Sequence, residues 1–222
     1  MQLLLLLFSF VVFNECQPAI IEPSTSKMQQ QQNIIESVKK NDITAVKKLL
    51  SNGADVNTRD KSGRSLLLIA TIQQQADMAK LLVAHGADVN LQADNLDSPF
   101  LYAGASGQTA LVKLFLANGA RFDMFNRYNG TALIPACERG HVETVTILAY
   151  TKGFPIDHVN RLGWTALSEA VILGNGSESY RQIVQILKDA GADLTIADKD
   201  GVTPLQHARS RGFKEIAEIL ER

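Results

Sequence analysis

Glycine recurs through this chain at a nearly fixed interval, and this interval constrains the fold more than any other feature. Gly53, Gly86 and Gly119 are 33 residues apart, and further copies follow at Gly153 and Gly191, after 34 and 38 residues. A period of roughly 20–50 residues indicates stacked units, each of which buries its apolar face against its neighbours. Such arrays generally hold partners rather than transform substrates. The sequence therefore predicts a repeat array in place of one globular core.

Each unit opens with a turn and a Ser- or Thr-led segment, then an alanine, then a second apolar run that leads to the glycine. The hydroxyl residues are Ser65, Ser98, Thr131, Thr165 and Thr203, and the alanines are Ala70, Ala103, Ala136, Ala170 and Ala208. A Ser or Thr here caps a helix, because its side-chain oxygen accepts a hydrogen bond from an unpaired N–H of the first turn. The second run has helical spacing, as in Val145 and Leu148, and its glycine permits a left-handed C-terminal turn. Each unit is thus predicted to be a helix–turn–helix.

This pattern resembles the ankyrin repeat, in which G-x-T-P-L-H-x-A opens the unit, G-H separates two helices and G-A-D-V-N closes it. The best matches are Gly201-Val202-Thr203-Pro204-Leu205 and Arg139-Gly140-His141-Val142-Glu143. The resemblance implies an all-α fold, an ankyrin-repeat solenoid of helix–turn–helix units with connecting loops like β-turns or hairpins. We place the ankyrin-repeat domain at residues 33–222 and expect about six repeats, namely 33–62, 63–95, 96–128, 129–162, 163–200 and 201–222, the first and last being caps.

Departures from the pattern predict local irregularities. Leu96 and Asn129 occupy the turn-glycine position, and Gln74-Gln75 replace the Gly-His pair, so we expect irregular turns and an altered helix junction. Pro135 falls inside an expected helix and predicts strain or a kink, because proline removes a backbone hydrogen bond and clashes with the preceding turn. The long fifth unit has a surplus at residues 175–179, whose composition predicts a surface loop between two helices; a partner-contacting loop is the alternative.

The N-terminal segment predicts export. Leu3 to Phe13 is apolar apart from Ser9, and a helix of that length spans about 16 Å, roughly half of a bilayer core. Such a run is typical of a secretory signal peptide, which we place at residues 1–19, and no stable membrane span is expected after its cleavage. An uncleaved anchor is the alternative. Residues 20–32, rich in Gln, Ser and Pro, are predicted to be a disordered linker. We expect a periplasmic or secreted protein.

The two cysteines bear on the source of the protein. If Cys16 is removed with the signal peptide, Cys137 has no intrachain partner, and we assign it to the core. Asn129 and Asn175 begin glycosylation sequons, which matter only in a eukaryotic exported chain. The absence of a disulfide framework favours a bacterial source.

Composition and motifs argue against several classes of function. A formal net charge of −1 over 222 residues provides no clustered positive field for nucleic acid. The four histidines lack companions at metal-ligand spacing. No nucleophile elbow, phosphate loop or dinucleotide fingerprint occurs. We therefore expect no catalytic residues, no metal, no cofactor, no nucleic-acid partner and no small-molecule substrate.

The resemblance implies that partners are held on one continuous concave face, formed by the loop tips and the outward side of each first helix. On this face we predict a partner-binding site at Arg64, Phe125, Arg127, Tyr128, Arg139, Arg161 and Trp164. Trp, Tyr and Arg are enriched among the residues that dominate protein interfaces, and equivalent positions of neighbouring units lie about 10 Å apart. For Phe125 and Trp164 the alternative is burial between turns as local packing.

The sequence thus predicts a non-catalytic scaffold or adaptor, expected to be monomeric, that binds another protein in the cell envelope or outside the cell. The alternative is a dedicated inhibitor or immunity-type protein that blocks one enzyme or toxin. Tight one-to-one binding with loss of the target's activity would distinguish the two. An enzyme is the least favoured hypothesis, and no feature of the sequence names the partner.

Overall fold

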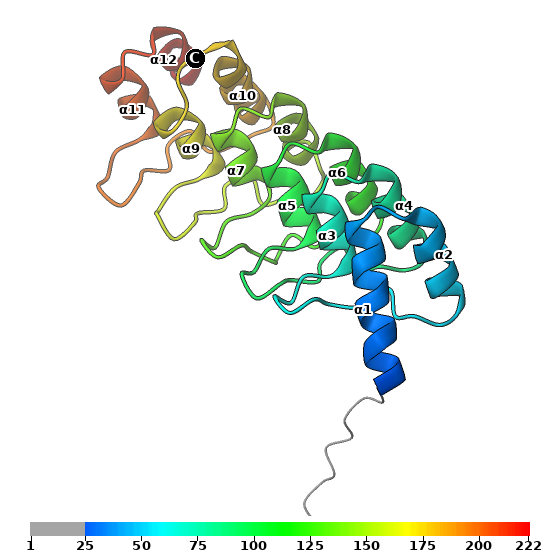
Figure 1. Cartoon of the computed structure of the whole chain (residues 1–222). Helices are drawn as coiled ribbons and strands as arrows, with labels where there is room; N and C mark the ends of the chain where they lie inside the picture. Colours follow the sequence, from blue (N-terminus) through cyan, green and yellow to red (C-terminus); the bar gives the residue numbers. More distant parts are fainter. Residues whose placement is uncertain (1–24) are drawn as a thin grey trace, which may run out of the picture.

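A computed structural model describes residues 25–222, so the predicted signal peptide at residues 1–19 lies outside the described residues. Residues 25–222 form helices that pair in order along the chain. The pairs are α1 (Thr25–Lys39) with α2 (Ile43–Ser51), α3 (Leu66–Ile72) with α4 (Ala76–Ala84), α5 (Pro99–Ala105) with α6 (Thr109–Leu116), α7 (Leu133–Glu138) with α8 (Val142–Ala149), α9 (Ala166–Ile172) with α10 (Glu178–Asp189), and α11 (Pro204–Ser210) with α12 (Lys214–Glu221). The pairs stack side by side, with odd-numbered helices in one row and even-numbered helices in the other (Figure 1).

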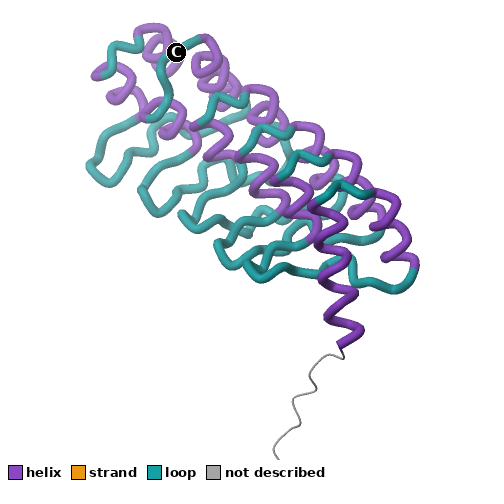
Figure 2. The backbone as a smooth tube through the Cα atoms, viewed as in Figure 1, coloured by secondary structure: helices purple, strands orange, loops and turns teal. Residues whose placement is uncertain are grey.

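The loops between successive pairs project from one side of the stack, beside the odd-numbered helices (Figure 2). Each closes on itself, because the backbone N–H at its start donates to the carbonyl four residues later, as in Asn126 to Gly130 and Asn160 to Trp164, both 3.0 Å. This is the hairpin-like loop that the resemblance implied, and the all-α solenoid is confirmed. We call the side formed by the loop tips and the odd-numbered helices the inner face; it corresponds to the predicted concave face.

The apolar core runs between the two rows along the whole stack. Its large members include Leu67, Leu82, Phe115, Leu148 and Leu187, which are all fully or almost fully buried. Burial of such a side chain contributes roughly 1.5–3 kcal/mol to the free energy of unfolding. Because every unit adds a few of these residues and contacts only its neighbours, the array has no single centre.

Small residues let neighbouring odd-numbered helices approach closely. The five repeat alanines, Ala70, Ala103, Ala136, Ala170 and Ala208, are all fully buried. Gly104 of α5 is tighter still, since a Cβ placed on it would lie 2.7 Å from the Cβ of Ala132 in the next unit. That separation is too short for two carbon atoms, so this contact requires glycine.

Helix caps explain where most inner helices begin, and Pro135 explains the exception. The side chains of Ser65 and Thr165 accept the N–H three residues later, at 3.1 Å in each case. In α3 the backbone N–H of Ile69 also donates to the Ser65 carbonyl, at 2.9 Å. In α7 the positions of Ile69 and Ser65 are held by Pro135 and Thr131, and Pro135 has no N–H to donate to the Thr131 carbonyl. As a result α7 begins only at Leu133, with no side-chain cap. The expected interruption of the helix is therefore a delayed start, with Pro135 in the first turn.

The predictions of irregular turns and an altered junction are wrong. Leu96 and Asn129 take up positive φ angles of 65° and 57°, close to the 70° of Gly63 at the same place in its turn. Gln74 likewise has φ 57°, and the next residue, Gln75, donates to the Ala70 carbonyl at 2.9 Å as its counterparts in other units do. The backbone keeps its regular form, and these residues carry the conformational strain.

Two loop predictions also need correction. The disordered linker at residues 20–32 is wrong for residues 25–32, because α1 begins at Thr25 and its glutamines form bonds one turn on, such as Gln29 Nε2 to Asn33 Oδ1 at 2.9 Å. Glutamine is also a good helix former. The surplus at residues 175–179 is only partly a loop, since Glu178 and Ser179 form the start of the twelve-residue helix α10.

Candidate functional site

Three of the predicted residues line one pocket on the inner face. Arg127, Tyr128 and Arg139 border a cavity of about 330 Å³ between the fourth and fifth units. The loops at 126–130 and 160–162 and the helices α7 and α9 provide its walls. Its other lining residues are Asn126, Gly130, Ile134, Pro135, Glu138, Asn160, Leu162, Glu169 and Leu173. We call this cavity the Glu169 pocket, after the residue that distinguishes it.

The rim of the Glu169 pocket exposes large apolar side chains. Tyr128 is 50% exposed, and Leu162 and Leu173 are each 46% exposed. The Arg127 guanidinium lies over the Tyr128 ring at 4.9 Å from its centroid, a cation–π arrangement. Aromatic and aliphatic side chains that gather on one side of a monomeric protein mark a surface suited to a partner.

The pocket also contains a buried carboxylate. Glu169 on α9 is only 5% exposed, and it accepts one hydrogen bond, from Asn160 Nδ2 to Oε1 at 2.8 Å. Burial raises its pKa to about 7, with a further contribution from the charge of Glu138, while the Asn160 bond and Arg139 act in the opposite direction. A carboxyl group that titrates near neutral pH inside a surface pocket is typical of functional sites.

Asn160 holds the turn and the carboxylate together. Its Oδ1 accepts the N–H of Leu162 at 2.9 Å and of Trp164 at 3.1 Å, which leaves Nδ2 to donate to Glu169. The side-chain amide is therefore oriented by two backbone donors. Glu169 is in turn fixed against the base of the loop that carries Leu162.

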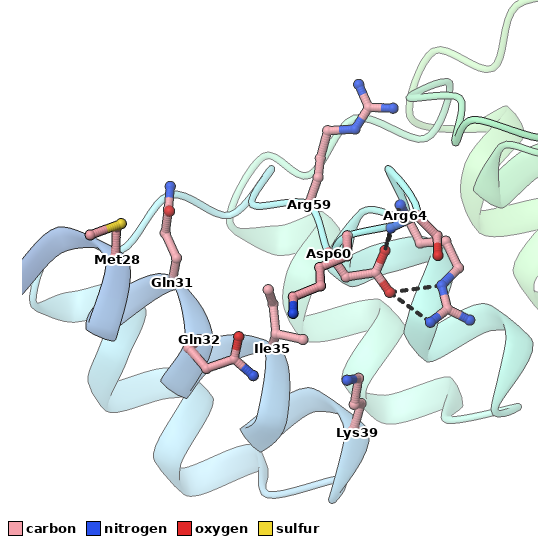
Figure 3. A pocket seen from close by; sticks show the side chains of 10 residues that line it. Met28, Gln31, Gln32, Ile35, Lys39, Arg59, Asp60 and Arg64 are labelled. Carbon is pink, nitrogen blue, oxygen red and sulfur yellow. Dashed lines mark hydrogen bonds and ion pairs between the residues drawn. The ribbon is translucent and has the colours of Figure 1, made fainter. Parts of the chain in front are cut away.

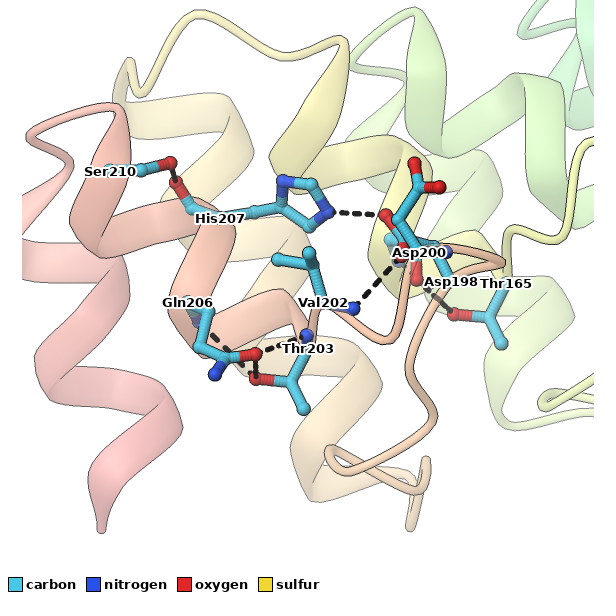
Figure 4. A network of polar contacts seen from close by, with 9 residues as sticks. Thr165, Asp198, Asp200, Val202, Thr203, Gln206, His207 and Ser210 are labelled. Carbon is cyan, nitrogen blue, oxygen red and sulfur yellow. Dashed lines mark hydrogen bonds and ion pairs between the residues drawn. The ribbon is translucent and has the colours of Figure 1, made fainter.

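The last unit repeats this arrangement with other residues. Asp198 accepts the N–H of Val202 at 2.9 Å and contacts His207 Nε2 at 2.7 Å (Figure 4). Asp198 and His207, like Asn160 and Glu169, are nine residues apart. The position of Glu169 and His207 is occupied by Ile69 and Tyr102 in two earlier units. A polar residue at a position that is apolar or aromatic in those units is the signal from which sequence reasoning could have found Glu169, and it was missed.

Arginines join the loops along the rim. The backbone N–H of Arg161 donates to the Tyr128 carbonyl at 2.8 Å, and its Nη1 donates to the Arg127 carbonyl at 3.0 Å. Arg139 Nη1 donates to the Ala105 carbonyl at 2.6 Å. Arg161 therefore joins the loops at 126–130 and 160–162 without lining the pocket, and Arg139 links the third unit to the fourth.

Phe125 and Trp164 lie outside the pocket lining. Phe125 is half-buried and stacks on His158, with ring centroids 4.3 Å apart and an angle of 11° between the planes. Trp164 is also half-buried. For Phe125 the structure shows the local packing between turns that was the alternative interpretation.

Arg64 lies at the other end of the array. It contributes to a hollow of about 510 Å³ between α1 and the first long loop, together with Gln32, Ile35 and Lys39 (Figure 3). Its guanidinium pairs with Asp60, Nη2 to Oδ2 at 2.6 Å. The seven predicted residues thus do not form one site, and Arg64 belongs to a separate, N-terminal surface.

The described residues offer no other chemistry of note. Within residues 25–222 no group of His, Cys, Asp and Glu side chains is arranged to hold a metal ion. No helix in that range has the length and apolar character needed to cross a membrane. Cys137 is fully buried, as expected for a core residue, and burial raises the pKa of its thiol well above the usual value.

Known proteins share this architecture. The family profile described as ankyrin repeats (3 copies) matches residues 34–126 and 100–198. The chain belongs to the ankyrin repeat family. It is 37% identical over 180 residues to the ankyrin repeat protein YahD of Escherichia coli K12, a match that covers 81% of this chain and 89% of YahD.

Solved ankyrin repeat structures superpose well on the chain. An ankyrin repeat domain from Acinetobacter baumannii AYE has a TM-score of 0.82 and 48% identity, covering 85% of this chain and 95% of that one. The ankyrin repeat protein EF0377 has a TM-score of 0.83 and 38% identity, with 86% and 96% covered. Ankyrin repeats are generally modules of protein–protein interaction.

Proposed function

We propose that this ankyrin repeat protein is a non-catalytic, monomeric scaffold that captures another protein on its inner face, centred on the Glu169 pocket. One observation carries the proposal: Tyr128, Leu162 and Leu173 are large, apolar and about half exposed around a single cavity. A protein interface typically gains most of its energy from a few such anchors. The near-zero net charge supports a protein rather than a nucleic acid as the partner.

The proposal is tested by capture with Tyr128→Ala. Purified full chain serves as bait for proteins of its own cellular fraction, and the captured protein is then titrated against each variant. Because Tyr128 is placed at an anchor position, Tyr128→Ala should weaken binding by about 30-fold, equivalent to about 2 kcal/mol.

Tyr150→Ala is the matched control. Tyr150 is 58% exposed and follows α8 in the other row of helices, so the loss of its ring should leave affinity unchanged. Equal affinity of the Tyr128→Ala variant and the native chain, with both folded by circular dichroism, would count against the inner face as the binding surface.

We also propose that the scaffold acts after export. The support is the apolar run from Leu3 to Phe13 in the sequence. Fractionation of cells that express the full chain should place the protein outside the cytoplasm. A variant with Leu5→Arg and Leu6→Arg, which interrupts the apolar run, should stay inside. Retention of the native chain in the cytoplasm would contradict export and leave the binding proposal untouched.

A further inference from the structure

The chemistry of the Glu169 pocket points to the kind of group that fills it, and this inference rests on the proposed function. A carboxylate has two oxygens with about four acceptor sites. Among residues 25–222 Glu169 receives one donor, Asn160 Nδ2, on Oε1. Because the side chain is 5% exposed, water solvates the remaining sites poorly. An ionised carboxylate in such surroundings is stabilised by a cation that brings its own N–H donors.

The arginines of the pocket do not supply this cation. Arg139 donates Nη1 to the Ala105 carbonyl at 2.6 Å, and Arg127 lies over the Tyr128 ring. Arg139 favours the charged form of Glu169 from a distance, but no ion pair of the described residues includes Glu169. Glu138 also lines the cavity, so the two carboxylates match the two arginines in number. Glu169 Oε2 is therefore left without a hydrogen-bond donor among residues 25–222, and a cationic N–H group could supply one.

The walls select the shape of the cationic group. Besides Glu169, the cavity is bordered by Tyr128, Pro135, Leu162 and Leu173, which offer aromatic and aliphatic surface. A small hydrated ion would leave this surface without contact. A lysine or arginine side chain matches both parts, because its methylene stem packs on apolar surface while its charged end makes hydrogen bonds.

We propose that the Glu169 pocket receives a lysine or arginine side chain of the partner protein, with the aliphatic stem between Tyr128, Leu162 and Leu173 and the charged end on the Glu169 carboxylate. The inner face thereby recognises a basic segment. Glu169 acts here as a residue that determines specificity, and the exposed rim supplies the apolar part of the contact.

The test uses peptides of defined chemistry. Three five-residue peptides, identical except for a central lysine, arginine or norleucine, are titrated into the full chain and followed by the methyl resonances of Leu162 and Leu173. The lysine and arginine peptides should bind with Kd on the order of 1 mM, as expected for one inserted side chain. The norleucine peptide, which has the stem and no charge, should bind at least about tenfold more weakly.

Glu169→Gln separates charge from shape. It should weaken the two cationic peptides at least about tenfold and leave the norleucine peptide unchanged. Glu143→Gln, at a solvated carboxylate on α8, should change nothing. Thermal melts confirm that each variant is folded. Equal binding of lysine and norleucine peptides, or undiminished binding to Glu169→Gln, would overturn the inference, as would the absence of any shift at Leu162 and Leu173.

The pH dependence provides a second readout. Since Glu169 must be ionised to bind the cation, affinity for the lysine peptide should rise about tenfold from pH 6 to pH 8. Other ionisable side chains lie on the elements packed against α9, so the comparison is the native chain against Glu169→Gln. They are Cys137, Glu138 and Arg139 of the α7 segment, Tyr180 of α10 and His207 of α11. A falling affinity over this range would contradict the proposal.

The outcomes distinguish this inference from the proposed function. If Tyr128→Ala weakens protein capture as predicted while the cationic peptides do not bind, the scaffold proposal stands and the basic-segment proposal fails. If the cationic peptides bind at the pocket while protein capture is indifferent to Tyr128→Ala, the pocket has the proposed chemistry but the captured protein does not use it, and the placement of the protein interface at this pocket fails.

Discussion

At the scale of single residues, Glu169 should make the protein less stable as the pH rises. Its folded-state pKa is about 7 against an ordinary value of 4.5, so the folded state holds the proton more tightly than the unfolded state. The contribution of the protonated Glu169 carboxyl to the free energy of unfolding is complete below about pH 4.5 and is lost as the pH rises through about 7. Glu169→Gln should remove this loss and raise the free energy of unfolding at pH 8 by about 2 kcal/mol.

Urea denaturation of both chains at pH 5 and pH 8 measures this effect. The difference between variant and native chain should be larger at pH 8, and Glu143→Gln should show no such trend. A native chain that gains stability relative to Glu169→Gln between pH 5 and pH 8 would refute the prediction. If Glu169→Gln is more stable than the native chain yet binds basic peptides poorly, then Glu169 lowers stability in return for binding.

Leu96 is a second residue under strain. It has φ +65° and is 41% exposed, so its side chain gives little burial in return for a left-handed conformation that costs roughly 1–2 kcal/mol. Leu96→Gly should raise the free energy of unfolding by about 0.5–1 kcal/mol after the greater backbone entropy of glycine is included. In a chain of this size that is a rise of about 1–4 °C in Tm.

Asn129→Gly is the comparison for Leu96→Gly. Asn129 has φ +57°, but asparagine tolerates this region, so the substitution should change Tm by less than about 1 °C. A larger gain at 129 than at 96 would show that strain is not what differs between the two turns. Calorimetric scans of both variants decide the matter.

At the scale of the elements, the start of α7 differs from the other inner helices. Thr131 is buried, and its hydroxyl has no partner among the described residues, whereas the Thr165 hydroxyl accepts the N–H of Ser168 at 3.1 Å. Thr131→Val should therefore be neutral or stabilising by up to about 1 kcal/mol, because it removes an unsatisfied polar group. Thr165→Val should be destabilising by about 1 kcal/mol, because it removes a cap.

The two threonine variants are compared by their urea midpoints. Both changes keep the branched shape, so the opposite signs isolate the hydrogen bond. A loss of stability at Thr131 as large as that at Thr165 would mean that the hydroxyl at 131 is paired after all.

Element boundaries show where sequence reasoning fell short. The Ser and Thr caps, the glycine stops and the apolar spacing were enough to predict a helix pair in each repeat. The extensions of α1 and α10 were not foreseen, because composition alone assigned Gln29–Gln32 and Glu178–Ser179 to loops. Each segment continues a helix whose next turns are anchored in the core, as Ile34 and Ile183 show, and helix propagation from an anchored turn costs little.

At the scale of the whole molecule, the 33-residue period was sufficient to predict the stack, since a repeat array follows from contacts between neighbours. The site was predicted only in part. Arg127, Tyr128 and Arg139 meet at the Glu169 pocket, whereas Phe125 packs on His158. Glu169 was not foreseen: its repeat position marks it as unusual, but its burial and its bond to Asn160 depend on α7 and on the closing of a loop, which the sequence does not show.

The closest contact described between neighbouring inner helices is at Gly104. Gly104 lets the backbone of α5 lie directly against Ala132 of the fourth unit, since a Cβ at position 104 would be 2.7 Å from the Ala132 Cβ. Any larger residue there would act as a wedge and tilt α7 with its Pro135 and Glu138. We therefore expect the width of the Glu169 pocket to depend on the absence of a methyl group one unit away.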